Sequence, residues 1–407
     1  MKLVMVIPTY WGRESSEGCR ETDKIYDHPT PLDQEGTLRR AIESIGNLGE
    51  RDFKLLVIAA ATAEDIQEKV EEKVREIVKS SHVDVEKIFF SYSHLENLHK
   101  LFQNEGMEDF IDLTSLKGYS NIRNLCILIP HILGADAAIL IDDDEVFEDP
   151  EFISKAREFI GRSYEGRIVH AVAGYHLQPY GGYLVKKSFR PWMRYWNQVE
   201  AMNETLRMLI ESGPRLKLTP MALGGNLIIH RSLFTEVPFD PYITRGEDID
   251  YVINSRIFGF NVFFDNQLSI RHLPPPSPHP VWKRLRQDIY RFIYEREKIK
   301  TIEKVRGVNP IKPEELDPYP GIFLREDLEE KIYQSSLALS LDYLVEGDIE
   351  SAREALENIV LAETDAKPRF NPFKHLLELR RQWRNLIDFT SRKSIQLEVR
   401  ELLEMVN

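Results

Sequence analysis

The sequence predicts an α/β fold, in which helices cover both faces of a mostly parallel sheet. Short apolar runs over 3–7, 55–61, 87–92 and 137–141 alternate with amphipathic helical periods, a pattern typical of parallel strands joined by helices. The first run ends at Pro8, which predicts a buried strand followed by a turn. Because ligands of such sheets bind at the carboxyl ends of the strands, the residues after the first and fourth runs are candidates for a functional site.

The rest of the chain is expected to add further strands and then helices. Helical periods of the first half occur over 37–45, 64–79, 94–104 and 121–133. Strand-like runs follow over 168–172, 226–229 and 260–264, with a helical insert near 195–212. We therefore expect a first domain over 1–280, a basic connecting helix over 281–305, a linker over 306–324 and an α-helical domain over 325–407.

Length, charge and cysteine content exclude several classes of protein. The chain has 407 residues and a formal net charge of −13, which argues against a general nucleic-acid binder but not against a local basic site for a phosphorylated small molecule. The two cysteines, Cys19 and Cys126, do not suffice for a disulfide framework or a zinc–thiolate site. With no signal-peptide core and no apolar stretch of about 18 residues, we expect a cytoplasmic protein without a transmembrane segment.

Four consecutive carboxylates, Asp142 to Glu145, follow the fourth apolar run directly. Crowded like charges raise carboxyl pKa values, and a divalent cation relieves this cost. If the segment is extended, its period of two places Asp142 and Asp144 on one face, where both would bind one Mg²⁺ or Mn²⁺. A solvated acidic loop is the equally weighted alternative for this cluster taken alone.

Two more candidate groups lie further along the chain. Gly246-Glu247-Asp248 precedes a helical period, and taken alone these carboxylates are best interpreted as residues that cap the helix and complement its dipole. His272 follows a strand-like segment. A single histidine is more often structural or exposed than a metal ligand.

The remaining candidates each have two interpretations. Gly224, Gly225 and Asn226 precede an apolar run, and the glycines permit either a close backbone approach to a ligand or, more commonly, a tight turn. Arg123 would place its guanidinium on a phosphate or in a surface ion pair. The basic helix over 281–305 suits a solvated face, a phosphate-bearing ligand or, as the least favoured reading, contact with a membrane surface.

The order of these motifs resembles that of GT-A fold glycosyltransferases, and most of all glycosyltransferase family 2. The resemblance covers residues 1–290 and rests on Pro8-Thr9-Tyr10, a Gly-x-x-x-x-Arg-Asn segment over 118–124, Asp-x-Asp over 142–144, Gly-Gly-Asn over 224–226, Gly-Glu-Asp over 246–248 and His272. It implies a Rossmann-like catalytic domain that binds a nucleotide-diphosphate sugar and moves the sugar, a hexose, to a hydroxyl acceptor.

The resemblance also implies roles for the donor-binding residues. Pro8, Thr9 and Tyr10 would line the pocket for base and ribose, and Arg123 would approach the nucleotide or its phosphates. The donor-binding set is completed by the first two carboxylates of the acidic cluster and by two residues of the Gly-Gly-Asn motif, namely Asp142, Asp143, Gly225 and Asn226. The long loop over 13–36 is an insertion that would cover the donor or the acceptor.

The metal ligands and the catalytic residues are implied in the same way. Asp144 and Asp142 would hold Mn²⁺ or Mg²⁺, and His272 would complete the coordination. The metal would neutralise the charge that develops on the diphosphate. Asp248 would be the general base for the acceptor hydroxyl, and Glu247 would hold the acceptor or the loop.

Other functions stay open beside this one. Inversion of configuration is favoured, but a retaining GT-A enzyme that makes a small glycoside, such as a glycerate-based solute, is the alternative. A degenerate domain that only binds ligands is a second alternative. A sugar-phosphate nucleotidyltransferase is disfavoured because a Gly-rich loop does not follow the first strand. The expected partners are donor and acceptor, with no nucleic acid, and apolar stripes over 325–405 suit a homodimer or a core.

Overall fold

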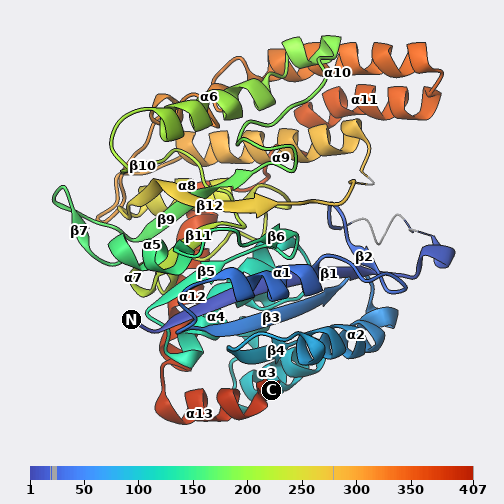
Figure 1. Cartoon of the computed structure of the whole chain (residues 1–407). Helices are drawn as coiled ribbons and strands as arrows, with labels where there is room; N and C mark the ends of the chain where they lie inside the picture. The colour runs from blue at the N-terminus through green and yellow to red at the C-terminus, as the bar shows by residue number, and fades with distance from the viewer. Residues whose placement is uncertain (19, 21–24, 278, 407) are drawn as a thin grey trace.

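An 11-stranded sheet forms the centre of the computed structural model, which describes residues 1–18, 20, 25–277 and 279–406 (Figure 1). Its strand order is β10-β12-β9-β11-β5-β1-β3-β4-β13, with β2 beside β1 and β6 beside β12. The strands are β1 (Leu3–Gly12), β2 (Thr30–Pro31), β3 (Lys54–Ala61), β4 (Glu86–Phe90), β5 (Ala137–Leu140), β6 (Glu145–Val146), β9 (Ala171–Leu177), β10 (Leu216–Leu218), β11 (Leu227–His230), β12 (Val262–His272) and β13 (Glu404–Met405). Strands β7 (Ser163–Tyr164) and β8 (Arg167–Ile168) form a separate hairpin.

Helices connect and cover these strands. They are α1 (Leu38–Ser44), α2 (Gln67–Ser80), α3 (Tyr92–Asn104), α4 (Tyr119–Leu133), α5 (Phe152–Phe159), α6 (Gln198–Glu211), α7 (Arg231–Phe234), α8 (Glu247–Ile257), α9 (Val281–Lys300), α10 (Leu328–Glu346), α11 (Ile349–Glu363), α12 (Pro372–Thr390) and α13 (Lys393–Leu402). Most lie within a few residues of the ranges that the sequence predicts, which confirms the α/β class.

Parallel pairing joins β4, β3, β1 and β5 in the N-terminal half of the sheet, and it joins β9 to β12. Strand β11 lies between these two groups and is antiparallel to both β5 and β9. The N-terminal group therefore has the parallel arrangement that the alternating pattern predicts. Strand direction in the second group depends on the path of the chain, which the local pattern does not report.

The alternation of side chains along the strands divides the core into two layers. In β1, Val4 and Val6 face one layer, whereas Met5 and Ile7 face the other, as the period of two requires. Helices α1, α2 and α5 cover the second layer, and α4, α8, α9 and α12 cover the first. Burial of each large apolar side chain contributes about 1.5–3 kcal/mol, so both layers stabilise the sheet.

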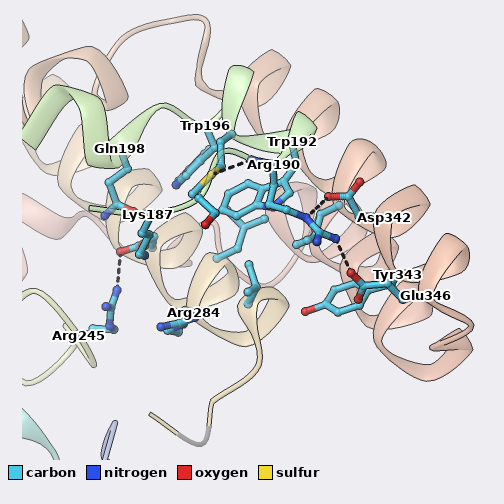
Figure 2. A pocket seen from close by; sticks show the side chains of 16 residues that line it. Lys187, Arg190, Trp192, Trp196, Gln198, Arg245, Arg284, Asp342, Tyr343 and Glu346 are labelled. Atoms are coloured by element: carbon cyan, nitrogen blue, oxygen red, sulfur yellow. Dashed lines mark hydrogen bonds and ion pairs between the residues drawn. The ribbon is translucent and has the colours of Figure 1, made fainter. Parts of the chain in front are cut away.

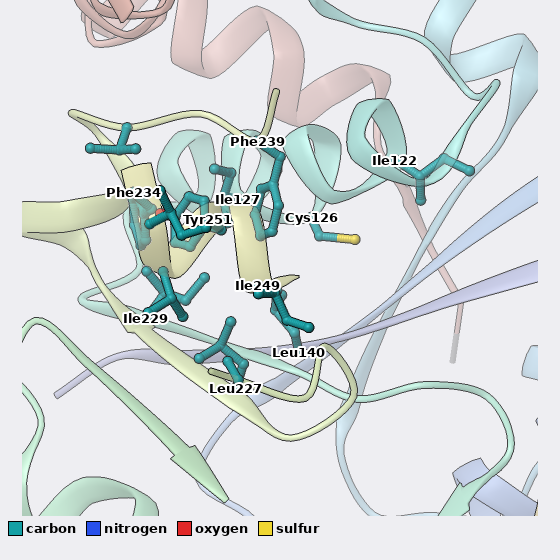
Figure 3. Packing of buried hydrophobic residues seen from close by; sticks show 14 of the residues in the cluster. Ile122, Cys126, Ile127, Leu140, Leu227, Ile229, Phe234, Phe239, Ile249 and Tyr251 are labelled. Atoms are coloured by element: carbon teal, nitrogen blue, oxygen red, sulfur yellow. The ribbon is translucent and has the colours of Figure 1, made fainter. Parts of the chain in front are cut away.

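The first layer is tightly packed beneath the carboxyl end of β5. Figure 3 shows Cys126 and Ile127 of α4 close to Ile249 and Tyr251 of α8, above strands β5 and β11. The rings of Phe239 and Tyr251 stack with their centroids 4.1 Å apart. This packing fixes α8 against the sheet, and it thereby fixes the position of the residues at the amino end of α8.

Strand β1 continues through Pro8 to Gly12, so the predicted turn at Pro8 is wrong. The backbone of Val6 accepts a hydrogen bond from Ile141 on the β5 side, and β1 pairs with β5 no further than Val6. Because the backbone groups of a strand repeat their direction every two residues, the backbone nitrogen of Pro8 points to the same side as that of Val6, where β5 has already ended. Because no partner strand needs its missing N–H there, proline does not interrupt the pairing with β3.

The C-terminal part of the chain packs on the same core as the first part. Residues 306–324, the expected linker, place Leu316, Tyr319 and Phe323 in the first core layer. Strand β13 returns to the sheet edge and pairs with β4, close to α3 in Figure 1. The division into domains at 280, 305 and 324 stays a prediction.

The apolar stripes of α10 and α11 are only partly buried. Leu339, Ala352 and Ala355 lie in the core, whereas Leu341 and Val345 are 56% and 89% exposed. Both helices stand at the end of the molecule opposite α13 (Figure 1). The homodimer stays a prediction. In the described part of the chain, none of the helices combines the length and apolar character needed to cross a membrane.

Candidate active site

A cavity of about 270 Å³ opens where β1 and β5 end. Tyr10 comes from β1, the acidic cluster follows β5, His272 ends β12, and Asp248 lies in the first turn of α8. Segments that are far apart in the sequence therefore meet at one edge of the sheet. This is the location that the parallel arrangement predicts for a ligand site.

The acidic cluster forms a turn, so the expectation of an extended segment is wrong. The backbone N–H of Glu145 donates to the carbonyl of Asp142 at 3.2 Å, which closes the turn. The carboxylate of Asp142 then contacts Arg123, with 2.7 Å between Oδ1 and Nη2. Asp144 points elsewhere and is almost fully buried. Because of this turn, alternation along a strand no longer argues that Asp142 and Asp144 share a metal ion.

Asp144 lies against two imidazoles. Its Oδ2 is 3.3 Å from Nε2 of His272 and 3.6 Å from Nε2 of His28. Neither of its carboxylate oxygens has a hydrogen-bond partner among the described residues. Burial alone would raise the pKa of Asp144, but His272, His28 and His176 outweigh it, and the pKa is lowered. Asp144 is thus a buried anion that lies close to imidazole nitrogens but has no hydrogen bond of good geometry to them.

Glu145 occupies a pocket that depends on Gly225. The side chain of Glu145 is fully buried and its Oε1 lies 2.6 Å from Nε2 of His176. A Cβ on residue 225 would stand 2.3 Å from that same oxygen, so only glycine fits. Burial and the charge of Asp142 raise the pKa of Glu145 well above its ordinary value. Gly225 makes room for Glu145 and does not line the cavity.

The predicted donor residues of β1 have different surroundings. Tyr10 lines the cavity, and its ring lies 4.4 Å from that of Tyr26. Thr9 is fully buried and donates through Oγ1 to Oδ2 of Asp143 at 2.5 Å. Trp11 in turn donates to Thr9 at 2.9 Å. Thr9 therefore orients Asp143, and burial together with the charge of Asp144 raises the pKa of Asp143 to about 7.

Arg123 links the acidic turn to α8. Besides its contact with Asp142, Nε of Arg123 donates to Oε1 of Glu247 at 3.3 Å. Burial and then the charge of Asp248 raise the pKa of Glu247 to about 7. Arg123 thus acts within an internal network that also borders the cavity. Arg123 is therefore not part of a surface ion pair, and its guanidinium is not free of protein contacts as a dedicated phosphate ligand would be.

Asp248 lies in the first turn of α8 and is held by two backbone groups. The N–H of Gly224 donates to Oδ2 at 2.8 Å, and the N–H of Ile249 donates to Oδ1 at 2.8 Å. Burial raises the pKa of Asp248, although Arg291 and Arg123 oppose this. The predicted capping role is present, but the carboxylate also lines the cavity and stands near two guanidinium groups.

Gly246 is the N-cap of α8 and has a φ of +76°. A Cβ there would stand 1.8 Å from Nη1 of Arg291, so this position requires glycine for space as well as for conformation. Arg291 is a buried residue of α9 that also contacts Asp288 at 3.2 Å. The basic helix therefore does not present all of its cations to solvent, because Arg291, Arg296 and Lys298 are buried.

The structure brings eight of the predicted site residues to the cavity: Tyr10, Arg123, Asp142, Asp143, Asp144, Glu247, Asp248 and His272. It leaves four others, Pro8, Thr9, Gly225 and Asn226, behind the cavity wall. Asn226 is fully buried and its Nδ2 donates to the carbonyl of Leu268 at 3.1 Å. These four support the site from behind, and contact with the donor stays a prediction for them.

Several residues of the site were not predicted. Asp27 and His28 come from the loop over 13–36, so the described part of this insertion does reach the cavity. Cys19 and residues 21–24 lie outside the described residues. His176 and Arg291 also line the cavity. The basic pattern over 281–305 was the only sequence signal that pointed to Arg291. Nothing in the local sequence marked His28 or His176 as site residues.

Comparison with known proteins gives no family. No protein-family model matches the chain, and no curated protein matches it in sequence. Among solved structures, it is similar to the mannosyltransferase PcManGT from Pyrobaculum calidifontis in complex with GDP-Man and Mn²⁺, with 11% identity, 96% of this chain and 87% of that chain covered, and a TM-score of 0.43. A mycobacterial protein is similar at 15% identity, 72% coverage of each chain and a TM-score of 0.38.

Proposed function

We propose that the chain is a metal-dependent glycosyltransferase, which moves a sugar from a nucleotide-diphosphate sugar to a hydroxyl acceptor. One observation carries this proposal: a single cavity joins an acidic turn, a histidine and a carboxylate held in the first turn of a helix, namely Asp144, His272 and Asp248. These are the residues to which the family resemblance assigns the metal and the base. The proposal rests on the site, not on the two structures named above.

The donor set around Asp144 fits a divalent cation that is shared with a substrate. Among the described residues, no three His, Cys, Asp or Glu side chains are arranged to hold one ion by themselves. Mg²⁺ usually takes one or two carboxylates and completes its coordination with water and substrate phosphates. Asp144, whose two oxygens are buried and unused, together with His272 provides such an incomplete set. When bound, the ion would supply charge neutralisation to the diphosphate.

Asp248 is the proposed general base. Its two backbone hydrogen bonds fix the carboxylate at the cavity wall, and its raised pKa makes it a stronger proton acceptor. In the proposed step the acceptor oxygen bonds to the anomeric carbon, while the bond from that carbon to the diphosphate oxygen breaks. The hydroxyl proton moves to Asp248, and the nucleoside diphosphate leaves with the bonding electron pair. This course inverts the configuration.

Arg123 and Glu247 would position the reacting groups. The buried guanidinium of Arg123 stands between Asp142 and Glu247 and places positive charge beside the proposed diphosphate site. Glu247 accepts from Arg123 and therefore fixes the start of α8. Tyr10 would offer its ring edge or face to the nucleotide. A retaining reaction would not need Asp248 as a base. The transfer activity of an Asp248 variant therefore distinguishes the inverting reaction from the retaining one.

A thermal-shift screen tests the proposal. The chain is heated with UDP-, GDP- and ADP-sugars in the presence of Mn²⁺, Mg²⁺ or EDTA. We expect one nucleotide to raise the melting temperature only with a divalent metal, because ligands that bind the native state stabilise it by mass action. The absence of a shift with every donor would contradict the proposal. A metal-dependent shift without turnover of any acceptor would favour the alternative of a binding module.

A further inference from the structure

A second cavity, of about 350 Å³, adjoins the candidate active site (Figure 2). It lies between the segment 187–198, the start of α9 and the end of α10. Gln198, Arg245 and Asp288 line both cavities, so the two cavities share this wall. A ligand in the second cavity would therefore have one end at the wall that this cavity shares with the candidate active site.

The end of the second cavity nearest the active site is cationic. Lys187, Arg245 and Arg284 line it, and Figure 2 shows their side chains on the same side of the cavity. Asp288 is the carboxylate at this end, and it already contacts Arg245 at 3.1 Å and Arg291 at 3.2 Å. Within the described residues, no carboxylate lies at ion-pair distance from Lys187 or Arg284. These two cations thus have no close carboxylate of their own, although the charge of Asp288 also acts on Lys187.

The charge of Arg284 and Arg245 acts on Lys187. Burial and these two guanidinium groups lower the pKa of Lys187, although the charge of Asp288 opposes them. An anion bound between these cations would relieve the repulsion. Lys187 lines the cavity and is exposed to solvent. An anion can therefore reach it.

The other end of the cavity differs in character. Arg190 is neutralised there, because it contacts Asp342 at 3.2 Å and also pairs with Glu346. Trp192 and Tyr343 contribute rings to the lining at this end. The cavity therefore offers uncompensated cations at its inner end and aromatic surface further out.

We infer that this second cavity binds the acceptor of the transfer reaction through a phosphate group, which Lys187 and Arg284 hold with Arg245. This inference rests on the proposed function. A phosphate accepts charge-assisted hydrogen bonds from guanidinium and ammonium groups, and arginine suits it geometrically. The acceptor hydroxyl would then extend past Gln198 toward Asp248. The same phosphate could belong to a soluble ester or to a lipid headgroup, and the two sources share this chemistry.

Calorimetry with glycerol 3-phosphate and with uncharged glycerol tests the cation site. EDTA is present so that a metal-held phosphate near Asp144 does not contribute. We expect the phosphate ester to bind and glycerol not to bind. The variants Lys187→Gln and Arg284→Gln should each weaken binding about tenfold, since a charge-assisted hydrogen bond is lost. Arg207→Gln is the matched control, because Arg207 lies on α6 outside both cavities, has a side chain 40% exposed and pairs with Glu200.

Flotation with phosphatidylcholine vesicles, with and without phosphatidic acid, tests the lipid source. Association that requires phosphatidic acid and is lost in the double variant Lys187→Gln/Arg284→Gln supports a lipid-borne phosphate. Calorimetric binding of glycerol 3-phosphate without vesicle association supports a soluble ester. Two results would overturn the inference: no binding of either probe, or equal binding by the double variant and the wild type. The metal-dependent donor shift is measured on the same proteins. If the wild type shows no metal-dependent donor shift but still binds glycerol 3-phosphate, the proposed glycosyltransferase function is refuted. The second cavity would then remain as an anion-binding site of unassigned function.

Discussion

Arg123 and Asp142 form an ion pair of 2.7 Å at the wall of the candidate active site, between α4 and the turn that follows β5. The side chain of Arg123 is only 4% exposed, whereas that of Asp142 is 31% exposed and faces the cavity. The same guanidinium contacts Glu247 at 3.3 Å. One buried cation therefore joins two acidic segments that are more than a hundred positions apart in the sequence.

Replacement of Arg123 should destabilise the fold as well as the site. Arg123→Met leaves the buried carboxylate of Glu247 without its cation, and loss of one partner of a buried pair costs about 3 kcal/mol or more. We expect the free energy of unfolding in urea to fall by that order. Arg123→Lys keeps the charge but not the two separate contacts, so its loss should be smaller. A stability of Arg123→Met equal to that of the wild type would contradict this role.

The substitution Asp248→Asn should separate donor binding from transfer. An asparagine oxygen still accepts the N–H of Gly224, so the local fold and the metal-dependent donor shift should persist. Transfer, measured as release of nucleoside diphosphate with an acceptor, should slow by about a hundredfold or more because a general base is lost. Normal turnover by this variant would remove Asp248 from the base role and favour a retaining course.

Removal of the metal, or of a residue that binds it, should weaken binding of the nucleotide-sugar donor. EDTA and Asp144→Ala should both abolish the donor-dependent thermal shift, and His272→Ala should move the Mn²⁺ titration to higher concentration. His82→Ala is the matched control, because His82 is exposed and lies away from the cavity. If His272→Ala and His82→Ala titrate alike, the role of His272 is structural.

Gly246→Ala should cost more stability than the same change at another glycine with positive φ. Gly347 ends α10 with a φ of +80° and has open space around a Cβ, so Gly347→Ala reports the backbone penalty alone, about 1–2 kcal/mol. Gly246→Ala adds a collision with Arg291 and should displace it. Urea unfolding of the two variants measures the difference. Equal losses would show that Arg291 moves aside without cost.

His131 should make the fold sensitive to mild acid. This residue of α4 is fully buried, and burial followed by the charge of Arg231 lowers its pKa to about 4. The unfolded chain takes up the proton near pH 6.5, so its proton uptake exceeds that of the folded state as the pH falls from about 6.5 to 4. Stability is therefore present above this window and is lost within it, by an amount on the order of 3 kcal/mol.

Urea unfolding at several pH values measures this loss. His131→Gln should flatten the dependence between pH 6.5 and 4, while His82→Gln, at an exposed position, should leave it as in the wild type. An unchanged slope in His131→Gln would assign the acid sensitivity to other groups, such as His94 and His176, whose pKa values burial also lowers.

Local patterns were sufficient for the elements of the sheet. The apolar runs over 3–7, 55–61 and 137–141 lie within or largely within β1, β3 and β5, because a buried parallel strand needs apolar side chains on both faces. The position of the site at their carboxyl ends followed from the same pattern. Pro8 misled because its effect depends on whether a neighbouring strand needs its N–H, and β5 ends just before it.

The sequence by itself determined which chemistry the site carries: a cluster of carboxylates after a buried strand, a histidine at the end of another, and an acidic helix start. Only the tertiary structure decided how these groups are used. In the folded chain Asp142 pairs with Arg123, whereas Asp144 lies against His272 and against His28 from a distant loop. Arg291 packs directly against Gly246. The reason is physical: residue types fix charge and ligand preference, whereas the contacts of a buried charge depend on which distant segments pack around it.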